Sequence, residues 1–362
     1  MGWTLNRYFL LHYLKITVYF LVGIFILALL MDFTFNAGRL SGLPGYSALG
    51  AFTVSMLRIP FFMQKLLPFV ALFAAMAALM TLNKRNELVI TRSVGISAWQ
   101  FLLPLLLGSF VLGLLAIFVL NPLAAKGSEK AEDMLASWRG DGGIVTAAAQ
   151  MIPWLIQKTD EGTTIIGAKA FLERGKFLVN AQFIQFKSDG HVDSWIDAQS
   201  AILQKGNWVL QNASKHRSGQ PPEFVDEMLI PTGLKPQYVE QRLADPETIP
   251  FFELPHMIKL AKSYGFSANK FDMHFQSLVA LPALLVAMTL IAATVSLRFA
   301  RFGQSSLAIL AGIFCGFVLY VISELVQAFG IAGIVLPVIA AWVPVLIAFF
   351  FSISFLLHKE DG

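Results

Sequence analysis

Four ionisable residues interrupt long apolar stretches of the chain, and they are the first candidates for chemistry. Asp32 ends one apolar run, Arg58 and Lys65 lie within a second, and Glu324 separates two more. A charged group in an apolar medium is costly, so such groups usually face a partner charge, a cavity or the nearest water. The residue types alone leave open a structural ion pair, a ligand site and an acid pair for catalysis.

Two carboxylates among apolar residues are typical of an intramembrane aspartyl protease, but their sequence context does not match one. Asp32 lies in Met-Asp-Phe-Thr, and the second acid is a glutamate. The sequence also has no His-Glu-x-x-His and no Gly-x-Ser-x-Gly motif, and His191, His216 and His256 are far apart along it. We therefore expect no catalytic residue, no metal site and surface positions for these histidines.

A phosphate-binding loop is also missing from the sequence, since no Gly-x-x-x-x-Gly-Lys-Ser/Thr motif occurs. The chain therefore does not have the sequence of a P-loop nucleotidase. If the protein performs work, the energy must come from a separate ATPase or from an ion gradient. We expect the chain itself to bind no cofactor.

The composition indicates that lipid surrounds most of the chain. Of the 362 residues, 56% are hydrophobic and 14% are charged, whereas a soluble domain has about 25% charged residues. The single cysteine, Cys315, excludes an intrachain disulfide. The net charge of +4 is modest and the sequence has no basic run, so nothing points to nucleic acid.

The apolar stretches predict about six membrane-spanning helices, because about 20 apolar residues cross the hydrocarbon core. Three precede a polar central segment and three follow it. A signal peptide is the alternative for the first stretch, but no small-residue cleavage site follows it. The stretches are Ile16–Met31, Ala51–Leu82, Ser93–Ala125, Phe275–Leu297, Phe302–Ser323 and Leu325–Leu357.

Short loops rich in Lys and Arg mark the cytoplasmic side of a membrane protein. The opposite loops of this chain hold little positive charge: Arg39 in one and none in Gly330–Gly333. We therefore expect both termini in the cytoplasm and the central segment on the outer side. The residues that set this orientation are Arg7, Lys15, Lys84, Arg85, Arg92, Arg298, Arg301 and Lys359.

The central segment, about residues 126–270, is predicted to be an antiparallel all-β sandwich or roll. Short runs rich in β-branched and aromatic residues alternate with Gly-containing turns. Phe177, Val179, Ala181 and Phe183 occupy alternate positions of one such run. Residues Phe251–Ser263 have a helical pattern and lead back to the membrane.

The loop between the second and third spans is predicted to form a short amphipathic helix at the cytoplasmic surface. Glu87, Leu88, Ile90 and Arg92 lie on adjoining faces at three- and four-residue spacing, and Gly95 offers a stop. A helix of this kind can dock a partner. An ordinary charged inner loop is the alternative.

Positive charge near the outer side of the first two spans indicates a ligand class. Arg39, Arg58 and Lys65 lie in the outer parts of these spans or just beyond them. A row of cations next to apolar residues suits an anionic amphiphile that carries phosphates.

Several features spread along the chain occur together in one known family. Nearly the whole chain resembles the LptF/LptG permeases, the membrane subunits of the lipopolysaccharide export transporter, and it is more similar to LptG. The order and spacing of the features carry the resemblance, rather than any single motif. They are Tyr46-Ser-Ala-Leu-Gly50, Pro68, Arg85-Asn-Glu-Leu-Val89 with Gly95, Asn121-Pro122 and Gly316-Phe-Val-Leu-Tyr320.

The resemblance implies one subunit of an ABC transporter in the bacterial inner membrane. Its partners would be an LptF-like permease, a dimer of an LptB-like ATPase that uses ATP and Mg²⁺, and an LptC-like periplasmic bridge protein. The permeases would take lipopolysaccharide from the outer leaflet. The implied domains are helices 1–3 in residues 1–125, a periplasmic β-jellyroll in 126–265, and helices 4–6 in 266–362, with a coupling helix at about 84–95.

The resemblance also implies two groups of functional residues. The ATPase-coupling residues would be Arg85, Glu87, Leu88, Val89, Arg92 and Gly95. The lipopolysaccharide cavity would include Arg39, Arg58, Phe61, Phe62, Lys65, Phe69, Phe317, Tyr320 and Glu324.

One departure from the family concerns phosphate binding. A family member has a lysine near the end of span one, where this chain has Phe33 and Asn36, and only Arg39 fits a later basic position. We therefore expect either that phosphate contacts shift to Lys65 or that the native lipid carries fewer phosphates. A membrane scaffold or assembly protein without transport activity is the alternative function.

Overall fold

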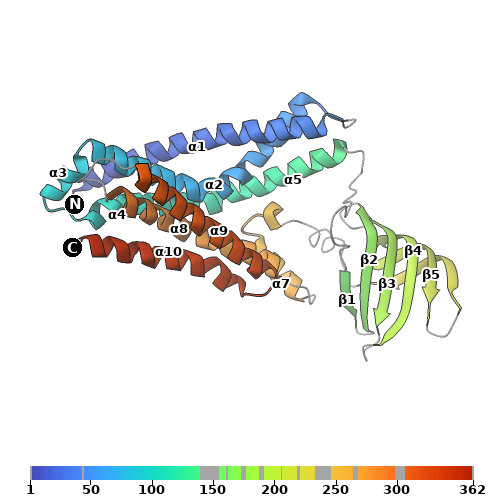
Figure 1. The fold of residues 1–362 in the computed structure, drawn as a ribbon. Helices are drawn as coiled ribbons and strands as arrows, with labels where there is room; N and C mark the ends of the chain where they lie inside the picture. Colours follow the sequence, from blue (N-terminus) through green and yellow to red (C-terminus); the bar gives the residue numbers. More distant parts are fainter. Residues whose placement is uncertain are drawn as a thin grey trace.

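A computed structural model describes residues 2–42, 45–138, 155–159, 162–172, 177–186, 191–204, 206–217, 221–232, 246–263, 268–297 and 306–360. Long helices form a bundle, and a sheet lies beyond one end of it (Figure 1). The helical elements are α1 (Trp3–Leu40), α2 (Ala48–Lys84), α3 (Glu87–Ser93), α4 (Ala98–Leu115), η1 (Ala116–Leu120), α5 (Asn121–Trp138), η3 (Pro246–Thr248), α7 (Leu254–Ser263), α8 (Asn269–Ser296), α9 (Ser306–Ile331) and α10 (Pro337–Glu360). The strands are β1 (Leu155–Thr159), β2 (Gly162–Leu172), β3 (Phe177–Phe186), β4 (Val192–Gln204), β5 (Asn207–His216) and β6 (Glu223–Pro231).

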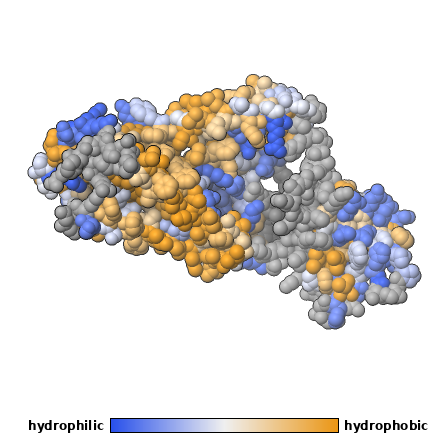
Figure 2. Space-filling view, viewed as in Figure 1, coloured by the Kyte–Doolittle hydropathy of each residue, from blue (hydrophilic) through white to orange (hydrophobic). Residues whose placement is uncertain are grey.

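The prediction of spanning helices in two triplets is confirmed. Six helices in the described part of the chain are long and apolar enough to cross a membrane. The third runs without a break through α4, the π-helical turn η1 and α5. Hydrophobic residues form a broad band across the middle of the bundle on the face shown in Figure 2. Both termini and α3 lie at the end of the bundle away from the sheet (Figure 1).

Helix α1 continues past Asp32 to Leu40, so Asp32 does not end the first span. Two further helix boundaries differ from those that the charge pattern predicted. Glu324 lies inside α9 and does not separate two spans. One exposed carboxylate does not end a helix, whereas Gly333, with φ of +76°, and the helix-initiating Pro337 do mark the turn. At the other boundary, α5 continues past residue 126 to Trp138. The inner-loop residues Arg298 and Arg301 lie outside the described residues.

The bundle core is centred on α2 and α8, which are the most buried of the candidate spans. Side-chain hydroxyls join the two triplets there. Tyr13 of α1 bonds to Ser109 of α4 at 2.8 Å, and Ser109 bonds to Thr289 of α8 at 2.5 Å. Ser109 and Thr289 also lie within hydrogen-bond distance of the Leu105 and Leu285 carbonyl oxygens of their own helices, so each of these buried hydroxyls has a partner for its one proton.

Helix α1 is the least buried of the candidate spans. Its buried side chains fall into two groups near its ends, and none of the residues from Val18 to Met31 is buried. The inner group is Phe9, Tyr13 and Thr17, and the outer group is Asp32, Asn36 and Leu40. The bundle therefore holds this helix at two separate places.

The inserted domain is an antiparallel sheet, as the all-β prediction requires. The described strands form one six-stranded sheet in the order β1-β2-β3-β4-β5-β6. Each described strand pairs with its neighbours in sequence, which is a meander, and none of these pairings is the crossover of a jellyroll. Phe183 and Trp208 meet edge to face in the core of the sheet, with ring centroids 6.0 Å apart.

The strict alternation predicted for β3 is interrupted. Leu178 is buried, but further along the strand Ala181 and Phe183 are buried instead, so the inward face changes by one residue. The cause is Asn180, whose φ of +47° lies in the left-handed region that asparagine tolerates better than most residues. Asn212 has the same effect on β5, with a φ of +51°.

A close approach of α5 to α2 provides a test of the bundle packing. A Cβ atom on Gly127 of α5 would clash with the carbonyl oxygen of Leu57 on α2. Gly127→Ala should therefore lower the free energy of unfolding by about 1–3 kcal/mol, measured by thermal unfolding in detergent. Gly23→Ala is the matched control, because nothing lies within 4 Å of its Cβ position on α1. It should stabilise the helix by about 0.5–1 kcal/mol, and equal melting temperatures for both variants would refute the packing.

Candidate functional site

A strip of cationic and aromatic side chains follows one side of α2. Arg58, Phe61, Phe62 and Lys65 have the spacing i, i+3, i+4, i+7, which brings them onto adjoining parts of one helix face. The Arg58 guanidinium lies 5.5 Å from the centre of the Phe62 ring, and Lys65 Nζ lies 4.3 Å from the centre of the Phe61 ring. The two cations therefore rest on aromatic faces.

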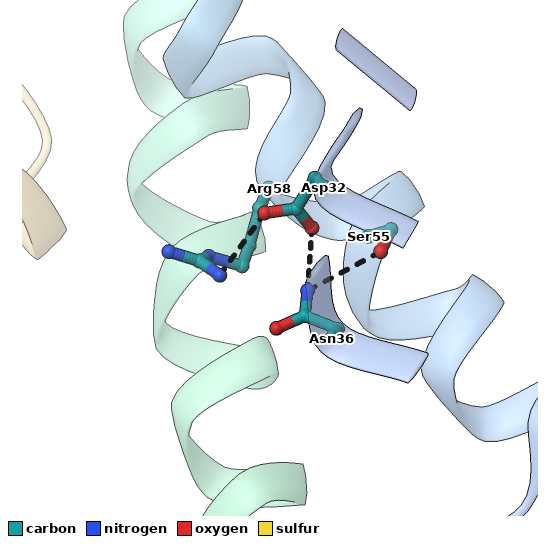
Figure 3. A network of polar contacts seen from close by, with 4 residues as sticks. All are labelled: Asp32, Asn36, Ser55 and Arg58. Carbon is teal, nitrogen blue, oxygen red and sulfur yellow. Dashed lines mark hydrogen bonds and ion pairs between the residues drawn. The ribbon is translucent and has the colours of Figure 1, made fainter. Parts of the chain in front are cut away.

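Arg58 belongs to a buried polar cluster that joins α1 to α2 (Figure 3). Its Nη1 atom lies 3.2 Å from Oδ1 of Asp32, whose side chain is 7% exposed. Asn36 donates to the other carboxylate oxygen at 2.7 Å and reaches Ser55 of α2 at 3.4 Å. We call Asp32, Asn36, Ser55 and Arg58 the outer clasp. Arg58, which the sequence led us to expect in the ligand cavity, forms an ion pair with Asp32 instead.

Lys65 faces a different partner. Its Nζ atom lies 2.9 Å from Oε1 of Glu247 in η3, the short segment that precedes α7. Both side chains line a cavity of about 300 Å³ between α2, α5, α8, α9 and η3. The cavity brings together four of the predicted residues, Phe61, Lys65, Tyr320 and Glu324. Sequence reasoning missed Gln64, Asn121, Glu247, Lys270 and His274, which also line it.

An apolar hollow of about 530 Å³ lies next to this polar cavity. It extends along α2 and α9 toward the end of the bundle that holds the termini. Phe69 and Phe73 line it from α2, and Phe314 and Phe317 line it from α9. The Phe69 and Tyr320 rings, 4.9 Å apart, lie between the hollow and the polar cavity. We call this combined surface of α2 and α9 the amphiphile wall, because its polar and apolar parts follow one another along the helices.

Two other predicted cavity residues lie away from the wall. Arg39 is exposed at the end of α1, where its guanidinium lies 5.8 Å from the centre of the Phe35 ring. Phe62 faces Arg58 and does not line the polar cavity.

At the opposite end of the bundle, α3 stands between two residues with left-handed backbone. Asn86 precedes it with φ of +57°, and Gly95 follows it with φ of +84°, as the predicted helix stop requires. Leu88 is 4% exposed and packs into the bundle core. The outward apolar side chains are Val89, Ile90 and Val94. Of the predicted coupling residues, Leu88 therefore holds α3 to the bundle, whereas Val89 is available to a partner.

The carboxylate of Glu87 is held in place from two sides. Tyr8 of α1 donates its hydroxyl to Oε1 of Glu87 at 3.2 Å, and Nη1 of Arg85 lies 3.9 Å from the same oxygen. Arg92 places its guanidinium 5.9 Å from the centre of the Phe101 ring on α4. The α3 surface thus presents an oriented carboxylate beside exposed apolar side chains.

The outer clasp makes a prediction about stability. Asp32→Ala leaves the Arg58 guanidinium and the Asn36 amide without their carboxylate, so it should lower the free energy of unfolding by about 1–3 kcal/mol. Adding Arg58→Met removes the orphaned charge and should recover most of that loss. Thermal unfolding of the single and double variants measures the coupling, and purely additive effects would show that the two residues do not interact.

Residues 7–358 match the family model described as "Lipopolysaccharide export system permease LptF/LptG". The lipopolysaccharide export system permease protein LptG of Escherichia coli strain K12 is 23% identical over 329 residues, which cover 88% of this chain and 89% of the relative. LptG of Escherichia coli O6:H1 strain CFT073 gives the same values. The chain, with its two triplets of apolar helices and its inserted sheet, belongs to the LptF/LptG family of lipopolysaccharide export permeases.

Proposed function

We propose that this chain is the LptG-type permease subunit of an ABC transporter that extracts lipopolysaccharide from the outer leaflet of the bacterial inner membrane. The amphiphile wall carries this proposal. Its polar cavity holds Lys65 and Lys270, and its neighbouring hollow is almost wholly apolar. A molecule with anionic groups at one end and acyl chains at the other matches that order of surfaces.

The orientation of the chain follows the distribution of positive charge. The termini and α3 lie at one end of the bundle with Lys15, Lys84, Arg85 and Arg92, and we assign this end to the cytoplasm. The sheet then lies in the periplasm, and the polar cavity lies in the outer half of the membrane. This depth suits entry of a lipid from the outer leaflet.

One wall does not enclose a lipid, so the transporter needs a second subunit. An LptF-like permease would supply the opposite wall, and the periplasmic sheet would pass lipid to an LptC-like bridge protein. The last strand and α8 are joined through η3 and α7, which places η3 at the polar cavity on the route from sheet to bundle. The chain itself catalyses no reaction in this scheme.

ATP hydrolysis would occur in a dimer of an LptB-like ATPase, which binds ATP and Mg²⁺. The sequence has no P-loop of its own. Helix α3 is the proposed coupling helix, because it presents Glu87 beside Val89, Ile90 and Val94 at the cytoplasmic end. A carboxylate oriented by Tyr8 is ready to pair with a basic residue of the ATPase.

Reversing the charge on α3 tests the docking role. Glu87→Lys should reduce co-purification of the ATPase at least about ten-fold, because an attractive charge contact becomes a repulsive one. Glu223→Lys on β6 is the control, since it makes the same charge change on an exposed residue of the sheet. Normal assembly and normal ATPase activity in the Glu87→Lys complex would contradict the docking role.

Photo-crosslinking tests the amphiphile wall directly. A photoreactive amino acid at Phe61, Phe317 or Tyr320 should capture lipopolysaccharide in membranes that contain the whole complex. The same label at exposed Phe350 on α10 serves as the control and should capture mainly phospholipid. Capture of phospholipid alone at all four positions would favour a scaffold without transport activity.

A further inference from the structure

Each of the two cations on the α2 strip is already paired with a carboxylate from another element. Arg58 pairs with Asp32 of α1, and Lys65 pairs with Glu247 of η3. The two pairs lie seven residues apart on one helix, which corresponds to about 10 Å along its axis. Their surroundings differ, and the difference decides which cation can accept an outside anion.

The Asp32–Arg58 ion pair is difficult to open. The Asp32 side chain is 7% exposed and has a second donor in Asn36 at 2.7 Å. Displacing this carboxylate would leave a buried charge and an amide without partners, which is strongly unfavourable. The Arg58 side chain is itself 34% exposed, so the persistence of the pair rests on the burial of Asp32 and on its second donor. Arg58 is therefore a structural cation.

The Lys65–Glu247 ion pair is easier to open, so another anion can replace Glu247 at Lys65. The Lys65 side chain is 51% exposed and that of Glu247 is 38% exposed, so water solvates either group when the pair opens. Pairs with this exposure contribute little to stability. The Phe61 ring stays under Lys65 Nζ at 4.3 Å, which keeps the ammonium group at the cavity when its carboxylate leaves.

The surroundings of η3 allow Glu247 to move without unfolding its segment. Four residues further along, the Phe251 N–H donates to Oδ1 of Asn121 on α5 at 2.8 Å. The Phe251 ring stacks on Phe275 of α8, with centroids 5.2 Å apart. These contacts fix the chain next to η3 independently of the ion pair, so opening the pair is a local side-chain event.

We propose that Glu247 is an exchangeable counter-ion of Lys65, and that an anionic group of the transported amphiphile displaces it. This inference rests on the proposed function of the amphiphile wall. Glu247 acts as a specificity residue, because a neutral ligand gains nothing at Lys65 and must leave the ion pair intact. A phosphate gains charge-assisted hydrogen bonds in exchange for one exposed pair. Lys270 and Glu324 line the same cavity.

Binding measurements on the complete transporter complex in lipid nanodiscs, with each substitution made in this chain, test the exchange. Glu247→Gln removes the competing carboxylate, so lipopolysaccharide should bind about two- to five-fold more tightly, the factor that corresponds to one exposed ion pair. Lys65→Gln should weaken binding about ten-fold, through loss of a charge-assisted contact. Glu253→Gln is the matched control, because Glu253 is exposed on the same connector and should leave binding unchanged.

The outcomes separate the exchange from the proposed function. If Lys65→Gln weakens binding and Glu247→Gln does not tighten it, the wall binds lipid but the exchange is refuted. If lipopolysaccharide binds no better than phosphatidylglycerol and neither variant changes its affinity, the proposed function itself fails. Inorganic phosphate at millimolar concentration should not displace the lipid. Displacement would overturn the assignment of the anion to a lipid headgroup, because it would identify a site for free phosphate.

Discussion

The cost of leaving a charge unpaired among apolar side chains governs the outer half of this bundle. In the outer clasp, Arg58 is paired with the buried carboxylate of Asp32, which also accepts a hydrogen bond from the Asn36 amide. These contacts fix the outer end of α1 against α2. Lys65 is paired with the partly exposed carboxylate of Glu247 on η3, and its ammonium group lies over the Phe61 ring. The same constraint thus yields one rigid and one adaptable pair on a single helix face. The amphiphile wall depends on both, since the rigid pair holds the helix that presents the adaptable one.

The two ends of the bundle carry the two surfaces on which the proposed function rests. At the outer end, α2, α9 and η3 form a surface whose character changes from polar to apolar along the helices. At the inner end, α3 is short, bounded by left-handed residues and anchored by Leu88. The buried hydroxyls of Tyr13, Ser109 and Thr289 connect the two helix triplets between these ends. The two surfaces therefore lie on one bundle whose helix triplets are hydrogen-bonded to each other.

The sequence was sufficient to predict the spans, the all-β insertion and α3, because each depends on local composition and periodicity. It was not sufficient to predict the pairing of Asp32 with Arg58 or of Lys65 with Glu247, since those partners meet only in the folded chain. Glu247 carried no local signal at all. The left-handed Asn180 shifted the buried face of β3, and a charge inside α9 was mistaken for a boundary. The ion-pair partners and the buried face of β3 were not predicted because they depend on tertiary contacts and on the backbone conformation of single residues.

The ends and the middle of α1 have different roles in the structure. This helix contributes buried side chains to the chain's own core only near its two ends, and its middle carries exposed apolar residues such as Val22 and Ile26. Substitutions among those middle residues should leave the folding free energy of the isolated chain almost unchanged, as is usual for exposed positions. The same positions are free to fit a neighbouring helix of any complementary shape. The middle of α1 can therefore vary while the clasped ends preserve the fold.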